Sequence, residues 1–140
     1  MLDSPELEER LAGYRRSFRP HRGSAPEVIL SLDLLIADTA EEARELALPE
    51  VWAMARSRTT GLFEALESVE QIRAARPSEK EAARVEEGLA RTAAGTDGMV
   101  RRRLEQLVER TRADEILSSA STYDREALAE SDARLAALLR

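Results

Sequence analysis

A carboxylate inside an otherwise apolar segment is the first candidate for chemistry in this sequence. Residues 28–36 read VILSLDLLI, and Asp33 is the one ionisable residue among them. Burial of an unpaired carboxylate costs several kcal/mol. Asp33 must therefore face a pocket, be paired by Ser31 and an arginine, or lie on a strand face that a partner covers. The sequence leaves these three alternatives open.

Basic side chains gather around the single histidine of the chain. His21 lies in a loop rich in proline and glycine, and a catalytic role would require an ordered partner and a pocket. A solvated loop histidine is the interpretation that the sequence favours. Arg15, Arg16, Arg19 and Arg22 could hold a phosphate or a carboxylate. Alternatively, they form a basic helix end that interacts favourably with the helix dipole.

Composition and motifs exclude several classes of function. The 140 residues include no cysteine, so a disulfide framework, a thiolate metal site and a cysteine nucleophile are excluded. The sequence also lacks a glycine-rich phosphate loop, an HExxH motif, a nucleophile elbow and a metal-ligand cluster. The net charge of −6 disfavours general nucleic-acid binding. No apolar run reaches the roughly 18–20 residues that span a bilayer, and no signal-peptide pattern opens the chain, so we expect a cytoplasmic protein without membrane contact.

Two strands and several helices are predicted to position these residues. Residues 28–36 predict a strand that is apolar on both faces, which is typical of a parallel sheet covered by helices. Residues 113–120, with the short apolar run Ile116 and Leu117, predict a second strand. Because helices separate the two strands, they form a βαβ unit with parallel strands and a right-handed crossover. Two strands make a poor sheet, so the chain, expected to be a single domain over residues 1–140, looks like a piece of something larger.

Helix boundaries are predicted by three capping boxes, in which Ser or Thr is followed three residues later by Glu or Gln. The boxes begin at Thr39, Ser68 and Ser78. Pro49 is expected to interrupt the helix that the first box opens, with the helix resuming through Val51, Trp52 and Ala55. We expect Asp38, beside that box, to serve the strand-to-helix junction rather than a ligand.

Five stretches of the sequence form one pattern, namely YRRSFRP at 14–20, ADTAEEARELA at 37–47, GTDGMV at 95–100, LVERTRADEIL at 107–117 and YD at 123–124. In order and spacing, from about residue 8 to residue 137, this pattern resembles the C-terminal part of the bacterial luciferase-like, flavin-dependent monooxygenases. One departure affects local structure, because Arg112 stands where the family has a glycine. A left-handed helix stop is then lost unless Arg112 adopts a strained conformation.

The resemblance implies a fold and a set of expectations. Members of the family are (β/α)₈ TIM barrels that bind FMN or the deazaflavin F420. We therefore expect an α/β, helix-rich C-terminal barrel fragment, with two parallel strands and flanking helices that resemble the last two βα units. Asp33, Ser118 and Ser119 would lie towards the barrel interior and are candidate cofactor-binding residues, whereas no catalytic residue is assigned. The first six βα units of the barrel are not represented, so this chain by itself is expected to bind flavin weakly or to hold no cofactor.

Two functions from different classes follow. The chain is either part of a luciferase-like flavin-dependent monooxygenase that needs a partner chain for catalysis, or a non-catalytic oligomerisation or protein-interaction module derived from that barrel. Under either hypothesis the exposed strand edges must be covered, by a homo-oligomer or by a barrel-completing partner chain.

Overall fold

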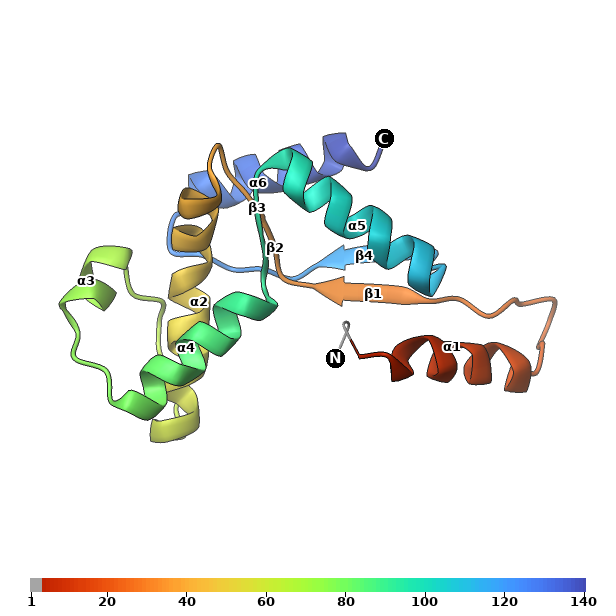
Figure 1. Cartoon of the computed structure of the whole chain (residues 1–140), viewed down its shortest axis with the longest axis horizontal. Coiled ribbons are helices and arrows are strands. Elements are labelled where there is room, and N and C mark those ends of the chain that lie inside the picture. Colours follow the sequence, from red (N-terminus) through yellow and green to blue (C-terminus); the bar gives the residue numbers. More distant parts are fainter. Residues whose placement is uncertain (1–3) are drawn as a thin grey trace.

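A computed structural model describes residues 4–140, which form six helices and four short strands (Figure 1). In chain order these elements are α1 (Glu6–Ser17), β1 (Ile29–Leu32), β2 (Leu34–Ile36), α2 (Ala40–Thr60), α3 (Val69–Ala74), α4 (Glu79–Arg91), β3 (Ala93–Gly95), α5 (Asp97–Thr111), β4 (Glu115–Ser118) and α6 (Arg125–Leu138). The fold is α/β and rich in helix, as expected. None of the helices within residues 4–140 is both long enough and apolar enough to cross a membrane.

The strands pair in parallel, which confirms the predicted βαβ arrangement. β1 pairs with β4 from Ile29↔Glu115 to Leu32↔Ser118, and β2 pairs with β3 from Leu34↔Ala93 to Ile36↔Gly95. The predicted strand 28–36 is thus broken at Asp33, and the short strand β3 was not predicted. Sequence patterns missed β3 because its three residues, Ala-Ala-Gly, carry little apolar signal.

β4 and β3 lie along opposite edges of the chain segment that contains β1 and β2. The Ser119 amide donates to the carbonyl of Leu32 at 3.0 Å, and the Ala93 amide donates to the carbonyl of Asp33 at 2.8 Å. These two acceptor carbonyls are consecutive, and consecutive carbonyls of an extended chain point to opposite edges. Asp33 is therefore the residue at which the strand changes its hydrogen-bonding partner from one side to the other.

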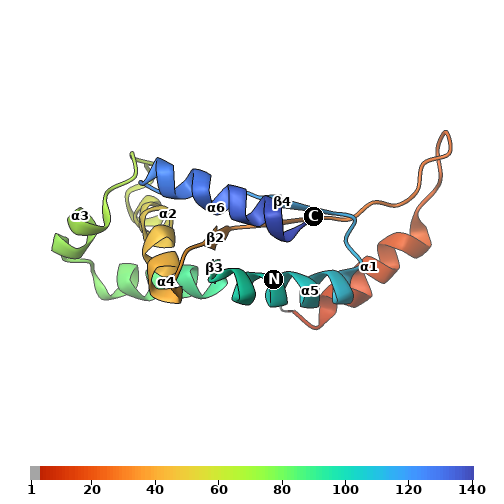
Figure 2. The same ribbon diagram turned by 90° about the horizontal axis from the view of Figure 1, so that it is seen from above.

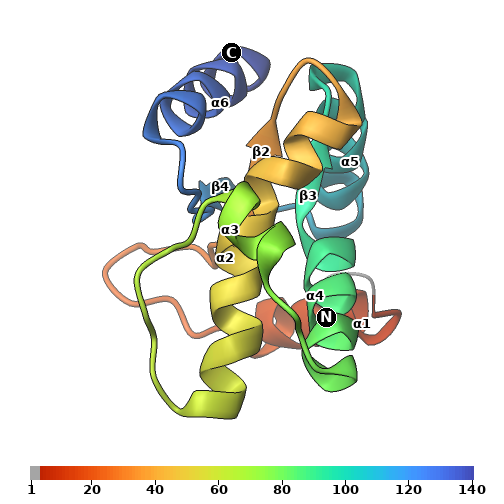
Figure 3. The same cartoon turned by 90° about the vertical axis from the view of Figure 1, so that its left-hand side faces the viewer.

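Helices cover β1 and β4 on one face. Leu30, Leu32 and Leu34 pack with residues of α5 and α6 in one apolar cluster, and both helices lie on the same side of the two strands (Figure 3). Seen from above, α5 and α6 run side by side along the strands (Figure 2). A second cluster joins Leu35 to Trp52 of α2 and to residues of α3 and α4.

The opposite face of β1 and β4 is bare. Its side chains, all exposed, are those of Ile29, Ser31, Asp33, Glu115, Leu117 and Ser119. The prediction that residues 28–36 are buried on both faces is therefore wrong for the first half of the segment, because α5 and α6 reach only one of its faces. It holds for the second half, since Leu34, Leu35 and Ile36 are all buried.

Helix ends follow the predicted signals, with one exception. All three capping boxes form, and at the first the Glu42 amide donates to Thr39 Oγ1 at 3.1 Å while the Thr39 amide donates to Glu42 Oε2 at 3.0 Å. Pro49 does not interrupt α2, which continues to Thr60 with Pro49 buried inside it. The prediction of a break was wrong because burial of this face of α2 outweighs the one backbone hydrogen bond that a proline removes.

Arg112 ends α5 in the left-handed conformation, with φ 50° and ψ 46°. The family resemblance implied a glycine at this position, and the helix stop is retained here with an arginine in its place. Arg15 of α1 supports the stop, because its guanidinium donates to the carbonyls of Thr111 at 2.7 Å and of Arg112 at 3.0 Å. This guanidinium caps α5 and is thus not directed at an anion.

Candidate functional site

The carboxyl ends of β1 and β4 carry the polar residues that the sequence singled out. Asp33 Oδ1 accepts a hydrogen bond from Ser119 Oγ at 2.9 Å, and both side chains are exposed on the bare face. Of the three alternatives for Asp33, the structure shows an exposed strand face, and the paired hydroxyl belongs to Ser119 rather than to Ser31. Asp33 and Ser119 thus lie together at the end of the strands where parallel α/β proteins hold their ligands.

Ser118 does not join this pair. It alternates with Ser119 along β4 and lies on the same face as Ile116, which packs against the cluster formed by α5 and α6. Because successive side chains of a strand point to opposite faces, Ser118 is directed away from Asp33. The structure thus brings together two of the three predicted cofactor-binding residues.

Glu50 is a candidate that the sequence analysis missed. It lies within α2 and its Oε2 accepts a hydrogen bond from the Ser121 amide at 2.7 Å. Burial raises the pKa of Glu50, and the negative charge of Asp33 adds to this effect, whereas the hydrogen bond from Ser121 opposes it. A carboxylate between Pro49 and Val51, in an otherwise apolar turn of helix, was the available signal. Glu50 therefore adds a second carboxylate to the polar residues Asp33 and Ser119 at the strand ends, and it contacts the loop that follows β4.

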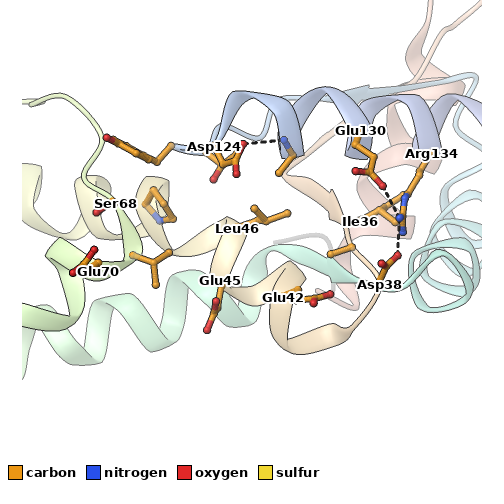
Figure 4. A pocket seen from close by; sticks show the side chains of 16 residues that line it. Ile36, Asp38, Glu42, Glu45, Leu46, Ser68, Glu70, Asp124, Glu130 and Arg134 are labelled. Carbon is orange, nitrogen blue, oxygen red and sulfur yellow. Dashed lines mark hydrogen bonds and ion pairs between the residues drawn. The ribbon is translucent and has the colours of Figure 1, made fainter.

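A pocket of about 540 Å³ is lined in part by that loop (Figure 4). Its walls come from the end of β2, the N-terminal half of α2, the start of α3, the loop after β4 and α6. Apolar surface is supplied by Ile36, Leu46 and Pro49, and the rim is strongly acidic. Like the Asp33–Ser119 pair, the pocket lies at the carboxyl ends of parallel strands.

Most of the carboxylates around the pocket already have structural roles. Arg134 lies 3.5 Å from Asp97. It also donates to Asp38 Oδ1 and to Glu130 Oε1, each at 2.6 Å (Figure 4). Hydrogen bonds to these carboxylates raise the pKa of Arg134. The guanidinium thus connects α6 to the residue before the first capping box and to the start of α5, and Asp38, which also lines the pocket, is bound by this arginine.

Three of the four remaining carboxylates of the rim serve helix ends or a surface pair. Glu42 belongs to the first capping box, and Glu45 pairs with Arg73. Asp124 Oδ1 accepts from the Glu126 and Ala127 amides at 3.0 Å and caps α6.

The pocket does not fit the phosphate group of a flavin nucleotide. A bound phosphate requires cationic side chains or free backbone amides. Arg134 is the one basic side chain among the residues that line the pocket, and it is engaged by carboxylates. This pocket therefore offers no phosphate-binding end for FMN.

The other sequence candidates lie far from this region. His21 and Arg22 are exposed in the turn between α1 and β1, where Arg22 has φ 52°. Within residues 4–140, histidine, aspartate and glutamate side chains nowhere form a group of three or more that could hold a metal ion.

The fold and the strand-end residues define a class, namely an α/β chain in which parallel strands are covered by helices on one face and carry polar groups at their carboxyl ends. No family model matches the chain. It is 32% identical to the uncharacterised protein YceB of Bacillus subtilis (strain 168) over 127 residues, which cover 89% of this chain and 38% of YceB. The crystal structure of apo-MsnO8 matches 96% of this chain with a TM-score of 0.77 and 23% sequence identity, and the match covers 41% of the MsnO8 chain. The chain thus has the fold of part of MsnO8 and spans about two fifths of the length of both proteins.

Proposed function

We propose that this chain is part of a luciferase-like flavin-dependent monooxygenase and supplies the last two βα units of its (β/α)₈ barrel. The observation that carries the proposal is the parallel pair β1–β4, covered by α5 and α6 on one face and bare on the other. In a TIM barrel each strand has helices outside and side chains packed in the interior. The bare face then corresponds to the barrel interior.

Two further observations support this function. The resemblance in sequence runs in register through both βα units, and the fold matches part of a longer solved chain. Asp33 and Ser119 lie at the carboxyl ends of the strands, which is the end of a barrel that holds the active site.

Catalysis requires more than this chain provides. A flavin supplies the redox chemistry when it is bound, and the pocket beside α6 offers no phosphate site for it. The role of this chain is to close the barrel, to present Asp33 and Ser119 to its interior, and to exclude water from the side that α5 and α6 cover. Catalysis is a property of the completed barrel.

The test is a pair of flavin titrations. The isolated chain should show no saturable binding of FMN or F420 in the micromolar range, whereas the chain assembled with the missing barrel units should hold flavin and show its visible absorbance. Tight flavin binding by the isolated chain would contradict the division of roles. A completed barrel that holds no flavin would favour the non-catalytic interaction module.

A further inference from the structure

β1 and β4 leave both outer edges without hydrogen-bonding partners within the described residues. In this register, the even-numbered residues of β1 and the odd-numbered residues of β4 point their amides and carbonyls at each other. The Glu115 amide donates to the carbonyl of Val28, and the Ser119 amide donates to the carbonyl of Leu32. The amides and carbonyls of Ile29 and Ser31 therefore point away from β4. Those of Ile116 and Ser118 point away from β1. Unpaired edges of this kind accept further strands.

The bare face combines apolar surface with negative charge. Ile29 is 56% exposed and Leu117 is 55% exposed. Asp33 and Glu115 lie on the same face, which carries no basic side chain among its described residues. A polypeptide that covers this face must therefore bury two aliphatic side chains and bring hydrogen-bond donors or cations opposite the two carboxylates.

The length of the matched proteins indicates what covers the face. This chain corresponds to 38% of YceB and 41% of MsnO8, so about three fifths of each protein lies outside the match. Parallel strands need neighbours that arrive through helical crossovers. A polypeptide built of βα units can place a parallel strand at each of the two open edges. A second copy of this chain related by a twofold axis would instead pair two identical edges in antiparallel orientation.

We propose that the bare face and open edges of β1 and β4 bind a polypeptide of further parallel βα units, which carries cationic or hydrogen-bond-donating side chains opposite Asp33 and Glu115. The proposal rests on the proposed function and names its partner. Ile29 and Ser31 pair with one strand of the partner, and Ile116 and Ser118 pair with another.

The test uses the absence of cysteine from the chain, which lets a single introduced thiol report on one position. A Leu117→Cys variant places the thiol on the bare face. The matched control is Leu62→Cys, at a position 64% exposed in the loop between α2 and α3, a loop that lies away from β1 and β4 (Figure 1). Each variant is labelled with a maleimide, first alone and then after co-expression with the portion of Bacillus subtilis YceB outside the 127 matched residues.

Both thiols should label at similar rates in the isolated chain. In the co-purified complex, labelling of Leu117→Cys should fall by at least about tenfold because the thiol reacts only when the interface opens, whereas labelling of Leu62→Cys should not change. Ser31→Pro removes an outward-facing amide but no hydrogen bond within the chain. This variant should lose the complex while its circular dichroism spectrum stays that of the unmodified chain.

Three results would overturn the proposal: no complex with the YceB portion, a complex that leaves Leu117→Cys fully reactive, or protection of Leu117→Cys in a dimer of this chain alone. A complex that protects Leu117→Cys but binds no flavin would support this inference and contradict the proposed function, so the two can fail separately.

Discussion

Ser131→Ala is the substitution for which the structure predicts the clearest loss of stability. Ser131 lies on α6 with 1% of its surface exposed, and its Oγ accepts a hydrogen bond from the Ile36 amide at 2.8 Å. No strand pairs with the Ile36 amide, because β4 ends before it and β3 pairs along the opposite edge of β2. The Ser131 hydroxyl therefore accepts the hydrogen bond that the carbonyl of a neighbouring strand would otherwise accept. Ile36 is itself buried, so water cannot replace the lost acceptor.

The magnitude follows from the cost of one buried, unsatisfied amide. Removal of a buried partner destabilises a protein by about 1–3 kcal/mol. With an unfolding entropy of about 2.1 cal/mol/K per residue, 140 residues convert this loss to a fall in Tm of about 3–10 °C.

Thermal unfolding followed by circular dichroism measures this effect. The matched control is Ser57→Ala, which removes an exposed hydroxyl that donates to the Met54 carbonyl within α2. The control should change stability by less than about 0.5 kcal/mol. If Ser131→Ala unfolded at the same temperature as Ser57→Ala, the assigned role of the Ser131–Ile36 hydrogen bond would be wrong.

Three further predictions concern helix ends and one half-buried acid. Thr39→Ala should lower the stability by about 0.5–2 kcal/mol through loss of the N-cap, as denaturant titration would show; an unchanged midpoint would contradict it. Arg112→Gly should raise Tm because glycine tolerates the positive φ, whereas Arg112→Ala, which keeps the strain, should not; equal Tm values for the two variants would refute the backbone explanation. Burial raises the pKa of Glu50, so the folded state binds a proton at this carboxyl more tightly than the unfolded state does. Stability is therefore lost as the pH rises from the unfolded pKa near 4.5 through the higher folded pKa. Glu50→Gln, whose amide oxygen can still accept from Ser121, should abolish this loss, so its advantage in Tm should grow with pH over that range; a constant difference would count against the raised pKa.

Much of the fold could be predicted from local signals. The capping boxes at Thr39, Ser68 and Ser78 predicted three helix starts because the reciprocal hydrogen bonds depend only on residues three apart. The parallel pairing of β1 with β4 could be predicted because helices separate the two strands. Features that depend on tertiary packing could not be predicted: the passage of α2 through Pro49, and the strand β3, whose three small residues form a strand only beside β2.

The candidate site was predicted in part. Asp33 was recognised because a carboxylate is unusual in an apolar strand. Its partner Ser119 was named, but the resemblance could not separate Ser119 from Ser118, since a single residue of register decides which face a strand residue occupies. Glu50 was missed because its proximity to Asp33 and Ser121 depends on how α2 packs across the strand ends.

The division of the core into two clusters affects how the protein unfolds locally. Leu34 belongs to the cluster under α5 and α6, and Leu35, the next residue, belongs to the cluster formed with α2, α3 and α4. Native-state unfolding proceeds in cooperative units that often coincide with such motifs. The two groups of helices therefore define two units, each with its own opening free energy. The amides of β2 lie between both, so they should exchange with deuterium only when both units are open and should be the slowest in the chain.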